Sequence, residues 1–139
     1  MRDRFLPITD STVGPLDGTW FMMSGQLGGI SLPDNAFGGL TFRVRCDRFE
    51  LGVDRGRIVV DGDVAPAALD VLIVAGPNRG RYVPGIIERA GPFLRICYDL
   101  GGTERPPAFR APPGTRYFLA TYRRALPRDT SPNCDAGGS

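Results

Sequence analysis

The chain has 139 residues, of which 42% are hydrophobic, and a formal net charge of +2. This length and composition are typical of one globular domain, and the charge is too small to indicate a nucleic-acid partner. The 17 basic residues are all arginine and are spread along the chain, and histidine is absent. An imidazole general base, a Ser–His or Cys–His nucleophile pair and a histidine-ligated metal are therefore excluded.

The two ends of the chain differ in composition from its middle. Residues 1–13 carry charge but no apolar signal-like segment, and no apolar stretch approaches the roughly 20 residues that span a bilayer. Residues 126–139 are mostly polar and have little to add to a core. We therefore expect a flexible segment over 1–13, a folded domain over 14–125 and a disordered tail over 126–139, in a cytoplasmic protein without a membrane partner.

The three cysteines, Cys46, Cys97 and Cys134, are far apart and form no CxxC pair. Their odd number and wide spacing indicate neither a zinc site nor a disulfide framework. We expect partly buried thiols at Cys46 and Cys97, an exposed thiol at Cys134, and no metal or other cofactor.

Glycine and proline occur along the whole chain and leave almost no stretch long enough for an α-helix. The segments between them alternate apolar and polar residues, as "TFRVR" at 41–45 does, which indicates strands. Eight strands are expected, at 18–26, 40–46, 48–53, 56–64, 68–75, 80–89, 93–100 and 116–124. Short turns separate most of them, which favours antiparallel hairpins, whereas 101–115 reads as a proline-rich loop.

One short helix is expected after the first strand, at 33–40. Pro33 and Asp34 suit its start, and Gly38-Gly39 suit its end. Eight sequential antiparallel strands with short turns predict an all-β, up-and-down barrel, because closing the sheet removes its exposed edges.

The only tryptophan, Trp20, lies at the start of the first expected strand, two residues after Gly18. A Gly-x-Trp at this place, with an arginine near the end of the last strand, resembles the pattern of the lipocalin-like (calycin) barrels. Glycine allows the chain to bend sharply, and an arginine can lie across the indole that closes the barrel. Arg123 and Arg124 are both suitably placed, and the sequence does not distinguish them.

A wider set of motifs covers most of residues 15–124. They are Leu16 with Gly18-Thr19-Trp20, Leu32-Pro33 followed by "DNAFGGL", "GPNRG" at 76–80, "LRICY" at 94–98, and Gly102, Glu104, Arg105, Pro106 and Phe109. In this order they resemble an uncharacterised domain family that is abundant in planctomycetes. The resemblance implies a lipocalin-like barrel, and it implies no catalytic mechanism.

The densest of these motifs, at 94–100, has two faces. Alternation predicts an inner set and an outer set on this strand: Leu94, Ile96, Tyr98 and Leu100 inside, and Arg95, Cys97 and Asp99 outside. The outer set could hold a reactive Cys97 or Asp99 whose pKa is lowered by Arg95. We instead expect an exposed Arg–Asp pair, which contributes little to stability.

Seven residues on the expected strands are candidates for a ligand site in the interior: Phe42, Val44, Leu51, Tyr82, Ile96, Tyr98 and Tyr122. The apolar side chains would form walls, and the tyrosine hydroxyls would orient a ligand. An eight-stranded barrel has an interior that side chains either fill or leave open to one small ligand. We therefore expect a binding module for a small apolar or amphipathic ligand that uses no metal or cofactor.

Three alternatives stay open, because one fold hosts many functions. The first is a cofactor-independent cyclase or isomerase that confines a flexible substrate in a reactive shape. The second is a structural or interaction module whose interior is fully packed. The third is a precursor protein in which another enzyme modifies Thr130, Ser131 or Cys134 of the tail.

Overall fold

The structure is a computed structural model that describes residues 16–36 and 40–125. The elements, in chain order, are β1 (Gly18–Leu27), β2 (Ile30–Ser31), the 3-10 turn η3 (Asp34–Ala36), β3 (Thr41–Arg45), β4 (Arg48–Leu51), β5 (Asp54–Asp61), β6 (Ala67–Ala75), β7 (Tyr82–Ala90), β8 (Phe93–Asp99) and β9 (Tyr117–Arg124). All of these strands except β2 were predicted, with ends that differ by a few residues. The segments 1–13 and 126–139, and with them Thr130, Ser131 and Cys134, lie outside the described residues.

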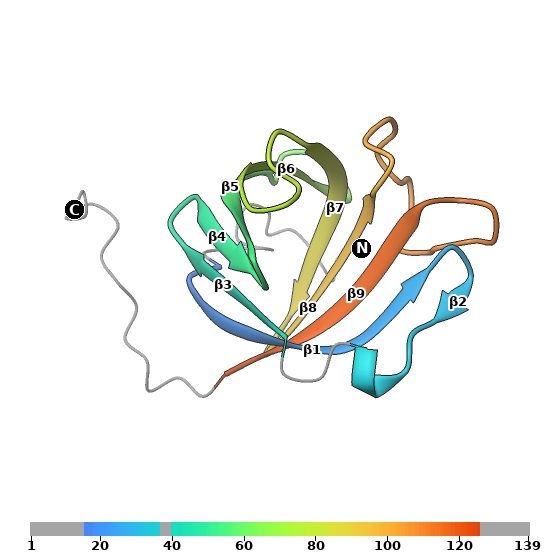
Figure 1. Cartoon of the computed structure of the whole chain (residues 1–139), viewed down its shortest axis with the longest axis horizontal. Coiled ribbons are helices and arrows are strands. Elements are labelled where there is room, and N and C mark those ends of the chain that lie inside the picture. Colours follow the sequence, from blue (N-terminus) through green and yellow to red (C-terminus); the bar gives the residue numbers. More distant parts are fainter. Residues whose placement is uncertain (1–15, 37–39, 126–139) are drawn as a thin grey trace.

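The predicted closed antiparallel barrel is confirmed (Figure 1). Each strand from β3 to β9 pairs with the next one along the chain, and β9 returns to pair with β1. The two-residue strand β2 pairs only with the end of β1, so eight strands form the closed wall. The helix expected at 33–40 is not found: the described part of that segment holds only η3, and 37–39 lie outside the described residues.

Side chains alternate across the wall as the sequence pattern requires. On β3, Phe42 and Val44 are buried, whereas Arg43 and Arg45 between them are exposed. The pairing between β5 and β6 contains a register shift between Arg55 and Gly56. A Cβ on Gly56 would lie 2.0 Å from the carbonyl oxygen of Leu72, so only glycine fits this close approach.

Trp20 closes one end of the barrel and is fully buried. Its indole Nε1 donates a hydrogen bond to the carbonyl oxygen of Leu16 at 3.0 Å. The guanidinium of Arg124 lies 5.3 Å from the indole centroid, and at Gly18, where φ is +130°, a Cβ would come within 3.2 Å of that guanidinium. Arg123 instead lies over Phe93, on the outer surface, at 5.5 Å. The structure thus assigns the closing contact to Arg124.

A second buried layer lies outside the barrel, under the 101–115 loop. Ile86 and Cys97 pair across β7 and β8 and are buried, yet neither belongs to the interior cluster. The loop covers them with Pro106 and Ala111, which are also buried. The outer face of β8, which we expected to be exposed, is therefore largely covered.

Two of the three cysteines lie within the described residues. Cys46, in the β3–β4 turn, is disulfide-bonded, so the expectation of a thiol there is wrong. Cys97 carries a buried thiol whose Sγ donates a hydrogen bond to the carbonyl oxygen of Arg110 at 3.3 Å.

Candidate functional site

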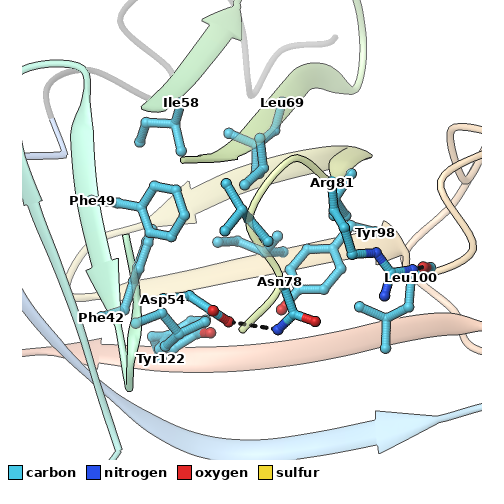
Figure 2. Close-up of a pocket in the computed structure, with 15 residues that line it drawn as sticks. Phe42, Phe49, Asp54, Ile58, Leu69, Asn78, Arg81, Tyr98, Leu100 and Tyr122 are labelled. Carbon is cyan, nitrogen blue, oxygen red and sulfur yellow. Dashed lines mark hydrogen bonds between the residues drawn. The ribbon is translucent and has the colours of Figure 1, made fainter. Parts of the chain in front are cut away.

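The barrel encloses a cavity of about 260 Å³ (Figure 2). Its lining comes from every strand between β3 and β9 and from the β6–β7 turn: Phe42, Phe49, Leu51, Asp54, Ile58, Leu69, Val71, Ile73, Asn78, Arg81, Val83, Ile96, Tyr98, Leu100 and Tyr122. Most of these side chains are apolar. Ligand pockets in proteins have this character, with an apolar wall and a few polar groups that set orientation.

The polar groups of the cavity gather at the end away from Trp20. The side chain of Arg124 contacts Trp20, and its backbone N–H donates a hydrogen bond to the carbonyl oxygen of Pro92, just before β8. Leu100 follows the far end of β8, and its carbonyl oxygen accepts a hydrogen bond from Arg81 at 2.7 Å. The cavity therefore has a closed apolar end and a polar end formed by turns.

Asp54 is the central group at the polar end. Its Oδ2 accepts a hydrogen bond from Nδ2 of Asn78 at 3.0 Å, which joins the start of β5 to the β6–β7 turn. Its other oxygen, Oδ1, is buried and has no hydrogen-bond partner among the described residues. A buried carboxylate oxygen without a partner is costly. An N–H or O–H group of a ligand that reached this oxygen would remove the cost.

Two tyrosines complete the cavity. Burial raises the pKa of the Tyr98 phenol, and the nearby carboxylate of Asp54 raises it further. Burial also raises the pKa of Tyr122, with a smaller contribution from Tyr98. The ring of Tyr122 packs against Phe42 with centroids 5.4 Å apart. Both phenols are thus neutral groups that can donate a hydrogen bond near an otherwise apolar wall.

Five of the seven predicted site residues line this cavity: Phe42, Leu51, Ile96, Tyr98 and Tyr122. Val44 is buried in the interior cluster but is not part of the cavity lining. Tyr82 lies on the outer face, 45% exposed, with its hydroxyl donating to Oδ1 of Asp70 at 2.6 Å. The prediction that Tyr82 faces the interior is therefore wrong. The adjacent residue, Val83, takes the inward position.

The polar end of the cavity was not predicted from the sequence. Asp54 is the first residue of β5 and Asn78 lies in the β6–β7 turn, and neither was predicted as a site residue. They are 24 residues apart and meet only because the barrel closes. Phe49 and Ile58 were also missed as cavity residues, although their alternation with arginine on β4 and β5 places them inside.

Asp99 serves the fold of the loop. Its carboxylate accepts hydrogen bonds from the backbone amides of Gly101, Thr103 and Glu104 and from the hydroxyl of Thr103, at 2.9–3.0 Å. Burial raises the pKa of this carboxyl, but the four hydrogen bonds together outweigh burial and hold the pKa below its usual value. With both oxygens engaged, Asp99 has a structural role.

Arg105 fixes the same loop to the outside of the barrel. It donates to the carbonyl oxygens of Leu69 and Gly85 at 3.1 and 3.0 Å and to Oδ1 of Asp70 at 2.8 Å. Burial raises the pKa of Asp70, and the hydrogen bonds from Tyr82 and Arg105 more than reverse this, so the carboxyl is ionised at neutral pH.

The other charged and nucleophilic groups of β8 also have structural partners. Arg95 pairs with Glu88 and lies over the ring of Phe109 at 4.4 Å, so the expected Arg95–Asp99 pair is not formed. Burial raises the pKa of Cys97, which outweighs the opposing effects of the Arg110 carbonyl and the Arg95 charge. A buried thiol with a raised pKa is a poor nucleophile.

Residues 16–36 and 40–125 contain no group of three or more cysteine, aspartate or glutamate side chains arranged to hold a metal ion. The same residues contain no helix that is long and apolar enough to cross a membrane. A search of family models, of curated proteins and of solved structures found no match to this chain.

Proposed function

We propose that the protein binds one small amphipathic molecule in the barrel cavity. The ligand has an apolar body, which contacts the aliphatic and aromatic wall, and an N–H or O–H donor at one end. The observation that carries this proposal is the unpartnered Oδ1 of Asp54 at the polar end of a cavity of about 260 Å³. Tyr98 and Tyr122 supply neutral hydroxyls close to the same space.

The proposal includes a lipocalin-like identity for the barrel and membership of the planctomycete-type family. The contact between Arg124 and Trp20 supports the first. Family membership is supported by the structural roles of the motif residues. Arg105 ties the 101–115 loop to the barrel through Gly85, and Glu104 accepts a hydrogen bond from the Tyr117 hydroxyl at 2.7 Å.

The cavity also bears on the alternatives. A structural or interaction module with a packed interior would leave no such space, so the cavity counts against it. Catalysis by confinement would use the same cavity. It is the second candidate, because Oδ1 of Asp54 could accept a proton from a bound substrate.

The first test is mass spectrometry of the protein purified gently from its host, sprayed under native and under denaturing conditions. An extra mass that appears only under native conditions is expected for a non-covalent ligand. A ligand that changes chemically during incubation would favour the catalytic candidate. A native mass equal to the sequence mass would count against a resident ligand.

The second test is an NMR titration with 2-phenylethylamine, which joins an aromatic body to an N–H donor. Tyr98→Phe should weaken binding several-fold, the effect of one lost hydrogen bond, and leave the fold intact. Tyr117→Phe is the matched control, because its hydroxyl bonds Glu104 outside the cavity. Leu51→Trp should fill the cavity and abolish binding. Equal affinities for Tyr98→Phe and Tyr117→Phe, or shifts confined to the outer surface, would contradict the proposal.

A further inference from the structure

A groove of about 670 Å³ crosses the outside of the barrel from β1 to β6, where the exposed side chain of Val74 lines its end. Its floor is one row of residues that pair from strand to strand: Gly18, Val44, Phe49 and Gly56. The side chains of Val44 and Phe49 point into the barrel, and Gly56 has none. The outer surface of this row is therefore bare backbone, lower than the rows on either side.

The rows on either side carry arginine. One wall is Arg45, Arg48 and Arg57, which pair in register across β3, β4 and β5. The opposite wall, also in register, is Thr19, Arg43, Glu50 and Arg55. All five arginines are exposed and line the groove. The arginines that the sequence analysis treated as spread along the chain are thus brought together by the register of three short strands.

The charges in the groove are poorly compensated. Arg55 approaches Glu50 only to 4.0 Å, and Arg57 approaches Asp47 only to 3.9 Å, both in exposed positions where ion pairs contribute little. Within residues 16–36 and 40–125, Arg43, Arg45 and Arg48 have no carboxylate within salt-bridge distance. Like charges directly opposite on neighbouring strands destabilise a sheet. The Arg45–Arg48–Arg57 row therefore imposes a cost that a bound anion would remove.

We propose that this groove binds a short oligophosphate chain, free or as part of a small molecule. Guanidinium groups match phosphate oxygens with paired hydrogen bonds. Neighbouring strands, and hence the arginines of one row, are about 4.8 Å apart, so a chain of phosphates lying along the floor would span the arginines of neighbouring strands. It would face arginine at every position of the Arg45–Arg48–Arg57 wall, whereas on the opposite wall Glu50 separates Arg43 from Arg55. The site is separate from the interior cavity and goes beyond the function proposed for it.

The groove favours phosphate groups over a nucleic acid strand. Proteins that bind single strands offer aromatic rings on which the bases stack. Among the described residues that line the groove, Phe49 is the one aromatic residue, and its ring lies inside the barrel and leaves only backbone facing the groove. The exposed groups of the groove can therefore contact phosphates but offer no ring on which a base could stack.

The test is calorimetric titration of the full chain with inorganic tripolyphosphate at physiological ionic strength, with inorganic monophosphate as the comparison. We expect saturable binding of tripolyphosphate that is much tighter than that of monophosphate. Arg48→Gln, in the centre of the all-arginine wall, should weaken it at least about tenfold. Arg79→Gln is the matched control, because Arg79 is an exposed arginine in the β6–β7 turn, outside the groove.

Stability is measured on the same variants, so that loss of binding is not mistaken for loss of folding. Arg48→Gln should unfold at the same or a higher denaturant concentration, since it relieves repulsion by Arg45 and Arg57. Arg45→Gln is a second variant with the same expectation. Equal affinities of Arg48→Gln and Arg79→Gln, equal binding of monophosphate and tripolyphosphate, or tighter binding of a single-stranded oligonucleotide would each overturn the proposal.

Discussion

The guanidinium of Arg124 lies over the indole of Trp20 and donates a hydrogen bond to the carbonyl oxygen of Asp17 at 2.8 Å. The contact joins the last strand of the barrel to the residues that precede the first, at the seam where β9 meets β1. Arg89 lies at the same distance from the indole, 5.3 Å, from β7. Three strands are thus tied to one buried ring at the closed end.

Arg124→Ala should lower the free energy of unfolding by about 1–3 kcal/mol, through loss of the cation–π contact and of the hydrogen bond to Asp17. The adjacent variant Arg123→Ala is the control, because Arg123 contacts Phe93 on the exposed surface. Its cost should stay below about 1 kcal/mol. Urea unfolding of the two variants measures both, and equal costs would show that Arg124 does not close the barrel.

Asp99→Asn should destabilise the protein at neutral pH by about 2–3 kcal/mol, because an amide group would face backbone N–H groups that the carboxylate now accepts. The pKa of Asp99 is lowered in the folded state. Its stabilising effect is therefore complete above the usual value of 3.8 and is lost as the pH falls through the lower folded-state pKa. Urea unfolding at several acidic pH values should show a shallower decline for Asp99→Asn than for the parent. The exposed Asp63→Asn is the control, and three parallel curves would contradict the assignment.

Cys97 reports on whether the 101–115 loop is in place. The thiol is fully buried and its pKa is raised, so it should react slowly with a thiol reagent in the native protein. Arg105→Ala removes four hydrogen bonds that hold the loop and should raise the rate at least about tenfold. The rate is followed by peptide mass spectrometry of the segment that contains Cys97. Arg79→Ala removes an exposed arginine elsewhere and should leave the rate unchanged; an equal rise in both variants would refute the role of Arg105.

The tyrosines should resist ionisation in the native protein. Tyr98 and Tyr122 have pKa values raised by burial, and the hydrogen bond to Glu104 raises the pKa of Tyr117 to about 12. Because the unfolded phenols release protons near 10.0, the stabilising contribution of these groups is present below that pH and is lost as the pH rises above it. Tyrosinate absorbance and circular dichroism, followed together from pH 10 upward, should change in one step. If all of the tyrosines ionised near pH 10 while the circular dichroism of the barrel stayed unchanged, the buried environment of Tyr98 and Tyr122 would be contradicted.

The strands and the closure of the barrel could be predicted because they depend on local alternation and on turn residues. β3 and β4 follow this pattern closely, with Phe42, Val44 and Phe49 inside and arginine outside. Tyr82 was misplaced because Pro84 and Gly85 interrupt the alternation of β7 and because a distant loop buries Ile86 on the outer face. No local signal shows that the 101–115 segment covers β7 and β8.

The polar end of the cavity and the arginine groove were harder to predict than the strands of the barrel, because both depend on how neighbouring strands are paired. Asp54 follows a turn and Asn78 lies in another, and nothing in the local sequence shows that their side chains meet. The five arginines of the groove form rows only once β3, β4 and β5 are paired. The side chains of Asp54 and Asn78 meet through the pairing of β5 with β6, whose register shifts between Arg55 and Gly56, and bulges are not visible in the residue pattern.

The short strand β4 separates the interior cavity from the outer groove. Phe49 and Leu51 point into the cavity, while Arg48 and Glu50 border the outer groove, so successive residues belong to opposite compartments. Deleting a single residue from the 46–47 turn would exchange the two sets, placing charge inside and an aromatic ring outside. Both the cavity and the groove therefore depend on the length of one two-residue turn, and a change in that length would remove them together.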